Sequence, residues 1–334
     1  MANVMRAIKN KTNLVVHAPT GLGKTIATLV PAIEYAKKND LKVLFLTSRN
    51  TQHLLAMQTL KDIKKETPLI ATDLIGRKHL CSQALPNFSA GELSEYCKLL
   101  KKEKKCSYYS TFAKSSGNLT VEGKLLMEEL QNKSPLLASE MIKMCEVRNS
   151  CPYEAAIELT KSSDVIVADY QFIFNTFIRK NLLGKINREL DDIILIIDEA
   201  HNLPNRIKNQ ASSYLTTLML KGAINEARKY DMNEIEEQLK KFEFILNSMS
   251  KRLKRDEQEM YITKEDFNDR LKRIKDIDEI IIAFEVAAEF IREKDNRSRI
   301  GGVANFLIEW QNQDKGYTRI LSTDSEKKNK NQND

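Results

Sequence analysis

The stretch APTGLGKT, residues 18–25, constrains the fold of this chain more than any other feature. It lies between a short β-branched run, NLVVHA (13–18), and a helical pattern, KTIATLVPAIEYAKK (24–38). Glycines at 21 and 23 let backbone N–H groups turn together toward phosphate oxygens, and the following helix adds the positive end of its dipole. The pattern therefore predicts a strand, a phosphate-binding loop and a helix in that order.

Every residue of this loop is a candidate nucleotide contact: Ala18, Pro19, Thr20, Gly21, Leu22, Gly23, Lys24 and Thr25. Lys24 would reach the β- and γ-phosphates, and the Thr25 hydroxyl would bind Mg²⁺. The simpler alternative is an ordinary glycine-containing turn before a helix. The two interpretations differ in whether an acidic partner for Mg²⁺ stands elsewhere in the chain.

A second motif, LIIDEAH (195–201), ends an apolar run with two adjacent carboxylates. A carboxylate at the carboxyl end of a parallel strand projects into the crevice where ligands bind. We therefore expect Asp198 to hold Mg²⁺ and Glu199 to act as the base or to position the attacking water, with Lys24 as the third catalytic group. The two acids would repel each other without a cation, which argues against a purely structural role.

The order of the apolar runs predicts the fold class. Runs at 42–47 and 68–72 alternate with helical patterns, and further runs follow at 164–170 and 193–203. Strands that are apolar throughout and alternate with helices indicate an α/β fold with a parallel sheet covered on both faces. Between them, residues 78–162 show only short helical patterns. We expect a sheet domain with two mainly helical insertions.

We divide the chain into five segments: 1–77, the first part of the sheet domain; 78–162, an insertion with all the cysteines; 163–209, the second part; 210–315, a helical insertion; and 316–334, a return strand (317–323) with a disordered tail. The 334 residues exceed what one core usually organises. No apolar run approaches the ~18 residues of a membrane span, and no signal-peptide core is present, so we expect a cytoplasmic protein, or a nuclear one in a eukaryote. The net charge of +7 is compatible with a polyanionic partner.

All five cysteines lie in one 71-residue window: Cys81, Cys97, Cys106, Cys145 and Cys151. Such clustering favours a metal site over disulfides. The window contains no CxxC pair, which weakens a zinc interpretation. From the spacing alone, a metal site and a set of ordinary thiols both remain open.

Five motifs taken together resemble the XPD/Rad3 group of iron–sulfur superfamily 2 DNA helicases, with DinG as a more distant relative. They are APTGLGKT, DEAH (198–201), TSRNTQ (47–52), GRKHLC (76–81) and SCPYEAA (150–156), and the resemblance extends from about residue 4 to 322. It implies a RecA-like sheet domain with an iron–sulfur insertion and an arch, the latter at 210–315. It also implies an ATP-dependent helicase that moves 5′ to 3′ on single-stranded DNA and opens duplexes in repair or transcription.

The resemblance also implies roles for particular residues. A 4Fe-4S cluster would be held by Cys81, Cys97, Cys106 and Cys151, and Cys145 would be a core thiol, with a swap between Cys145 and a ligand as the alternative. His201 would relay the state of the nucleotide. DNA contacts would come from Arg77, Lys78, Thr47, Arg49, Lys101 and Lys105, although a solvated helix face explains the last two lysines equally well. Expected partners are single-stranded DNA, DNA forks, ATP, and repair or transcription proteins.

Two features of the family are not matched by this sequence, namely its upstream glutamine motif and its second RecA-like domain. We therefore expect a fragment or split subunit that binds DNA and ATP but hydrolyses and unwinds poorly, because an arginine from the second domain can contribute 10³–10⁵ in rate in related enzymes. The rival hypothesis is a non-motor DNA-binding or scaffold module derived from such a helicase. A DinG-like enzyme acting on other DNA structures is a third.

Overall fold

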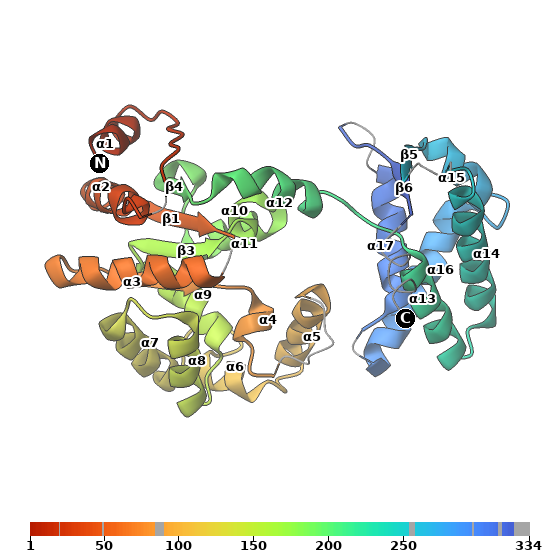
Figure 1. Ribbon diagram of the computed structural model, residues 1–334. Helices are drawn as coiled ribbons and strands as arrows, with labels where there is room; N and C mark the ends of the chain where they lie inside the picture. The colour runs from red at the N-terminus through yellow and green to blue at the C-terminus, as the bar shows by residue number, and fades with distance from the viewer. Residues whose placement is uncertain are drawn as a thin grey trace, which may run out of the picture. The chain divides into compact units, whose positions relative to one another are not determined.

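The computed structural model describes residues 1–19, 21–48, 50–83, 90–253, 258–295, 297–312 and 316–323. The chain forms two compact units, Met1–Ala211 and Ser212–Asp334, which are described separately (Figure 1). Among the described helices, none is long and apolar enough to cross a membrane.

The first unit is built on a parallel sheet of four strands: β1 (Lys42–Thr47), β2 (Ala71–Leu74), β3 (Val165–Asp169) and β4 (Ile193–Ile197). Their spatial order is β2-β3-β1-β4, and every neighbouring pair is parallel. Figure 1 labels three of them, with β1 between β3 and β4. The pairing of Thr47 with Asp169 and of Leu46 with Ile197 brings the carboxyl ends of the three strands β1, β3 and β4 to one edge. The predicted α/β fold with a parallel sheet is confirmed.

Helices cover both faces of the sheet because the strands are apolar on both faces. All six residues of β1 are buried, and successive side chains point to opposite sides. Phe45 packs in a core under α2 (Lys24–Lys38) and α3 (Asn50–Glu66). Leu44 packs in a different core on the other side. This two-sided burial explains why the run has no polar alternation.

The strand predicted at 13–18 is wrong. Residues 12–19 have no regular structure, and Val15 is 94 % exposed. A β-branched run forms a strand when a neighbour supplies ladder hydrogen bonds and a surface to pack on. The run has neither here, so β4 forms an edge of the described sheet and its Leu195 is 39 % exposed. The helix that precedes the run, α1 (Ala2–Lys9), packs against α2.

The cysteine-bearing insertion is helical, as predicted. It contains α4 (Arg77–Leu80), α5 (Ala90–Lys102), α6 (Ser107–Phe112), α7 (Val121–Lys133), α8 (Ala138–Val147) and α9 (Pro152–Ser162). Leu126 of α7 and Leu159 of α9 share one core with Leu44 and Ile166 of the sheet. The insertion is therefore packed onto the sheet rather than standing apart from it, and its limits at 78 and 162 stay a prediction. The unit is completed by α10 (Gln171–Phe174), α11 (Thr176–Ile186) and α12 (Leu203–Gln210).

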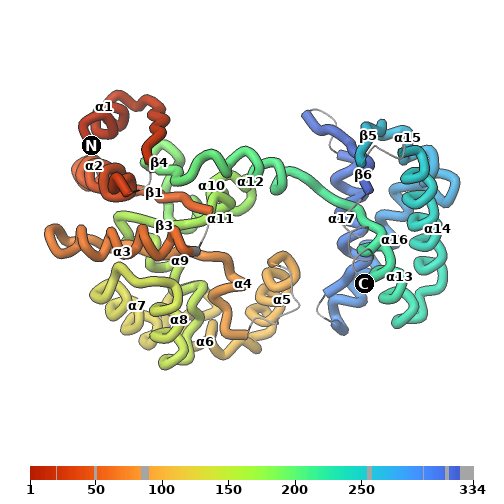
Figure 2. The backbone as a smooth tube through the Cα atoms, viewed as in Figure 1, coloured from red at the N-terminus to blue at the C-terminus, as the bar shows by residue number. Residues whose placement is uncertain are grey.

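The second unit is helical with a small two-stranded sheet. It contains α13 (Thr217–Lys229), α14 (Asn233–Ser250), β5 (Glu259–Tyr261), α15 (Lys264–Leu271), α16 (Ile277–Asp295), α17 (Arg299–Asn312) and β6 (Ile320–Ser322). Its core includes Phe242, which contacts the rings of Phe267 and Phe284. The strand predicted at 317–323 is present as β6, but it pairs antiparallel with β5 (Figure 2). Residues 316–323 thus belong to the helical unit, and the tail predicted to be disordered, 324–334, lies outside the described residues.

Candidate nucleotide site and cysteine pocket

The glycines of the predicted phosphate loop have left-handed backbone conformations. Gly21 has a φ of +88° and Gly23 a φ of +68°, and Gly23 is the N-cap of α2. An L side chain is strained at such φ values, so these two positions require glycine. Lys24 then begins a helix of 15 residues, which directs the positive end of its dipole toward the loop.

The structure brings the two nucleotide motifs together. The Lys24 Nζ lies 3.9 Å from the Glu199 Oε1 and donates a hydrogen bond of 3.1 Å to the Ala18 carbonyl oxygen. Both charged side chains are about one-third exposed, at 35 % and 31 %, so a ligand can reach them. The predicted meeting of the loop and the acid pair at one sheet edge is present in the structure.

Backbone hydrogen bonds fix the acid pair at the end of β4. The Asp198 N–H donates to the Leu46 carbonyl at 2.8 Å, and Glu199 has a left-handed φ of +50°. The buried Tyr170 hydroxyl donates to the carbonyl oxygens of both acids, at 3.0 Å for Glu199. Sequence analysis missed Tyr170, although its place at the end of the run 164–170 was a signal that it lies at the same edge.

The remaining loop and motif residues lie near this edge. The His201 Nδ1 is 3.4 Å from the Glu199 Oε2, and the His201 side chain is exposed. Ala18 and Thr25 are half-buried, whereas Pro19 and Leu22 are exposed. Thr20 lies outside the described residues. The nucleotide and Mg²⁺ roles of these residues stay predictions.

Tyr170→Phe tests the support of the acid pair. Removal of the hydroxyl leaves two carbonyl oxygens without this donor, so we expect the free energy of unfolding of the first unit to fall by about 1–3 kcal/mol. Urea denaturation measures the loss. Tyr261→Phe, on an exposed side chain of the second unit, is the control and should change stability by less than about 0.5 kcal/mol. Equal effects of the two variants would contradict the role assigned to Tyr170.

Asp198→Asn should stabilise the protein when no nucleotide or Mg²⁺ is present. Burial, and then the neighbouring Glu199, raise the pKa of Asp198 above its ordinary value. The folded state therefore favours the protonated carboxyl, and the ionised form lowers stability at neutral pH. We expect a higher melting temperature for the variant in EDTA at pH 7, with the gain shrinking as the pH falls through the raised pKa. A variant that melts at or below the temperature of the unaltered chain at pH 7 would contradict this.

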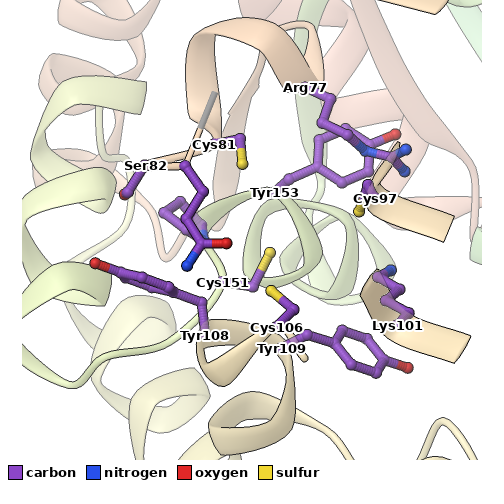
Figure 3. Close-up of a pocket in the computed structure, with 12 residues that line it drawn as sticks. Arg77, Cys81, Ser82, Cys97, Lys101, Cys106, Tyr108, Tyr109, Cys151 and Tyr153 are labelled. Atoms are coloured by element: carbon purple, nitrogen blue, oxygen red, sulfur yellow. The ribbon is translucent and has the colours of Figure 1, made fainter. Parts of the chain in front are cut away.

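Four of the five cysteines line one pocket. They come from four segments: Cys81 follows α4, Cys97 lies in α5, Cys106 precedes α6 and Cys151 precedes α9. Figure 3 shows their sulfur atoms turned toward the centre of the pocket. All are free thiols, and the described residues contain no group of three or more His, Cys, Asp or Glu side chains arranged around a single ion. Four convergent thiols suit a multi-iron cluster, in which each thiolate can bind its own iron.

Cys145 does not line this pocket. It is fully buried in the core that the insertion shares with the sheet, and burial raises its pKa to about 12. Such a thiol is protonated at neutral pH and acts as a small apolar side chain. Burial also raises the pKa of Cys151 to about 12, so Cys151 would bind a metal only by exchanging its proton for the metal.

Two of the residues predicted to contact DNA, Arg77 and Lys101, line the cysteine pocket. The Arg77 guanidinium stacks 4.3 Å from the Tyr153 ring centre and donates to the Ser94 Oγ at 2.9 Å, in the pocket wall. The Lys101 Nζ is 2.5 Å from the Glu154 Oε1, also in the wall.

Lys78, Lys105 and Thr47, which are also predicted DNA contacts, do not line the pocket. Lys78 is exposed, as is Lys105, whose Nζ is 2.7 Å from the Glu103 Oε2. Thr47 is buried and its hydroxyl donates to Gln52, whereas Arg49 lies outside the described residues.

Comparison with known proteins agrees with this arrangement. A family model described as DEAD_2 matches residues 47–220, and one described as DEAD/DEAH box helicase matches residues 2–84. Curated relatives include the regulator of telomere elongation helicase 1 homolog of Caenorhabditis elegans, at 23 % identity over 69 % of this chain and 25 % of the relative. The ATP-dependent DNA helicase XPD of Sulfolobus acidocaldarius is 24 % identical over 70 % of this chain and 37 % of the relative. The chain thus spans about a quarter to two-fifths of the length of these relatives.

Solved structures share the fold. One described as an XPD helicase superposes with a TM-score of 0.61 at 21 % identity and covers 93 % of this chain and 49 % of that one. A truncated XPD gives a TM-score of 0.58 at 20 % identity, over 92 % of this chain and 80 % of that one. Because the DEAD_2 model matches more than half of the chain, the protein belongs to the DEAD_2 family of XPD/Rad3-like helicases.

Proposed function

We propose that this chain is the nucleotide- and DNA-binding part of an ATP-dependent 5′–3′ DNA helicase of the XPD/Rad3 type. In this role it couples ATP hydrolysis to movement along single-stranded DNA and to duplex unwinding in DNA repair. The observation that carries the proposal is the approach of the Lys24 Nζ to 3.9 Å from the Glu199 Oε1 at the carboxyl edge of a parallel sheet. Ligands of open α/β sheets bind at this edge.

The residues at the edge can bind a nucleotide triphosphate. Backbone N–H groups of residues 21–25 would surround the phosphates, and Lys24 would exchange its contact with Glu199 for the β- and γ-phosphates. Thr25 and Asp198 would hold Mg²⁺, which would offset the repulsion between Asp198 and Glu199. Glu199 then orients the water that attacks the γ-phosphate and accepts its proton.

The pocket cysteines Cys81, Cys97, Cys106 and Cys151 would hold a 4Fe-4S cluster. The donor set supports this, because four thiols from four separate segments converge on one pocket. A bound cluster supplies covalent cross-links among these segments. The chain itself contributes the thiolates and the pocket wall.

Single-stranded DNA would bind through exposed cations near the pocket. Lys78 and Lys105 are exposed and can contact phosphates. Arg77 is held by Tyr153 and Ser94, so it would position the adjacent segment rather than track the backbone freely. The expected partners are DNA forks, a second helicase domain, and repair or transcription proteins.

The experiment is a DNA-stimulated ATPase and unwinding assay in two arms, with the chain alone and with the second helicase domain of a relative added in trans. The proposal expects slow hydrolysis alone and a large increase in both activities when the second domain is present, because that domain contributes an arginine worth about 10³–10⁵ in rate in related nucleotide hydrolases. DNA binding with no gain in either activity would instead support the non-motor scaffold.

The scaffold alternative has one observation in its favour. Thr47 is buried and Lys101 is paired with Glu154, so two of the predicted DNA contacts are turned inward. A motor needs DNA contacts that change with the nucleotide state, whereas a scaffold does not. The alternative therefore expects that DNA affinity is the same with and without ATP.

A further inference from the structure

Several cations, with a carboxylate between two of them, stand beside the cysteine pocket in the described part of the chain. Arg77 and Lys101 line the pocket beside the cysteines, as Figure 3 shows. Lys185 extends from α11 toward Glu154 and Tyr153. Glu154 is the acid among them, three residues after Cys151. Arg77, Lys101 and Lys185 thus place positive charge beside the four thiols, and Glu154 places a negative charge among them.

Glu154 holds the two lysines in place. The Lys101 Nζ is 2.5 Å from its Oε1, and the Lys185 Nζ is 3.9 Å from its Oε2. Glu154 is only 16 % exposed. Burial would raise its pKa, but the lysines outweigh burial and lower it, so Glu154 is ionised at neutral pH. The carboxylate thus fixes both cations instead of leaving them free in solvent.

Two aromatic rings fix the cations further. The Arg77 guanidinium lies 4.3 Å from the centre of the Tyr153 ring, and the Lys185 Nζ lies 5.7 Å from the same ring. The Lys101 Nζ lies 4.2 Å from the centre of the Tyr109 ring. Tyr109 and Tyr153 follow Cys106 and Cys151 by three and two residues. The charges are therefore held at set positions relative to two of the cysteines.

Lys185 differs from the other members of this group. It belongs to α11, a helix that comes after β3 along the chain. Arg77, Lys101 and Glu154 belong to the insertion. No cysteine lies on α11, and the Lys185 side chain is 41 % exposed. Its charge can therefore be removed without changing a helix that bears a pocket cysteine.

We infer that Arg77, Lys101 and Lys185, with Glu154 as their counter-charge, set the reduction potential of the cluster held by the four pocket cysteines. The inference rests on the cluster of the proposed function. Reduction adds negative charge to a group that already bears four thiolates, so cations held beside it favour the reduced form. A nearby carboxylate has the opposite effect and disfavours the reduced form. The potential then depends on Lys185, a residue outside the insertion.

Two substitutions should move the potential in opposite directions. Lys185→Met removes a cation and should lower the reduction potential, whereas Glu154→Gln removes the anion and should raise it. Lys180→Met, an exposed residue of the same helix, is the matched control and should leave the potential unchanged. The measurement is a redox titration of the anaerobically purified full chain, followed by visible absorption, after iron and sulfide have been quantified for each variant.

The outcomes separate this inference from the proposed cofactor. If the unaltered chain contains no iron and sulfide, the proposed cluster fails and the inference fails with it. If the cluster is present but Lys185→Met has the same potential as Lys180→Met, the cluster stands and the inference is overturned. The inference is also overturned if both variants keep their iron and Lys185→Met and Glu154→Gln shift the reduction potential in the same direction. If the Glu154→Gln protein loses its iron, the difference in reduction potential between Lys185→Met and Lys180→Met alone decides whether the inference holds.

Discussion

Cys151→Ser should yield protein that has lost its iron, whereas Cys145→Ala should yield protein that retains it. Cys151 lines the pocket with three other cysteines, while Cys145 lies in the apolar core and does not line the pocket. Loss of one of four thiolates removes a cluster ligand, and a serine hydroxyl is a poor substitute for a thiolate at iron. Iron, sulfide and visible absorption of anaerobically purified protein measure the result.

The same substitution should loosen part of the insertion. Each of the helices α4, α5 and α6 has one buried residue, Leu80, Leu93 and Phe112 respectively. With so little apolar burial, these three short helices would gain much of their stability from the cross-links of the proposed cluster. We expect limited proteolysis to cut the Cys151→Ser protein between residues 77 and 112 faster than the unaltered protein.

Cys145→Ala is the control for both measurements. It removes a buried thiol, so it should lower stability slightly, but it should keep the iron and the slow proteolysis of residues 77–112. Full iron content in Cys151→Ser would contradict the ligand set. Loss of iron in Cys145→Ala as well would support the swap between Cys145 and one of the four assigned ligands.

The sheet could be predicted from the sequence because β1 and β3 are short, largely aliphatic runs buried on both faces, and the edge strand β4 is aliphatic as well. The runs that became β1, β3 and β4 have this composition, and their order with helices between them leaves a parallel sheet as the simple solution. The run at 13–18 has the same composition but no ladder partner in the structure, and composition cannot show whether a neighbouring edge is used.

The candidate sites could be predicted only as far as local motifs extend. Lys24, Glu199 and the four pocket cysteines stand in recognisable sequence contexts, and the structure brings each set together. Lys185 and Glu154 are 31 residues apart in the sequence and lie on different elements, so no spacing predicts their ion pair. Lys101 was expected on a DNA-facing surface, and its pairing with Glu154 depends on how α5 and α9 pack.

Lys24→Ala should weaken ATP binding by about 100-fold, because a hydrogen bond between charged groups contributes about 1.5–3 kcal/mol. Lys24 would have a second effect on the proposed site: its ammonium group lies 3.9 Å from Glu199 and would offset the repulsion between that carboxylate and a bound γ-phosphate. The dissociation constant for ATP with Mg²⁺, measured by calorimetry on the full chain, tests the change. Lys38→Ala, on an exposed lysine of the same helix, should bind ATP as the unaltered chain does.

Glu199→Gln shows whether Lys24→Ala weakens ATP binding because a phosphate contact is lost or because the loop is damaged. This variant removes a negative charge beside the γ-phosphate and leaves Lys24 in place, so ATP should bind at least as tightly as to the unaltered chain. Hydrolysis in the presence of a second helicase domain should fall by about 10²–10⁴, the usual contribution of a general base. If Lys24→Ala and Glu199→Gln weaken ATP binding equally, the two side chains support the loop rather than act on the phosphates. Opposite effects on binding are expected only where the lysine and the carboxylate both face the γ-phosphate, as proposed for these two groups, which lie 3.9 Å apart.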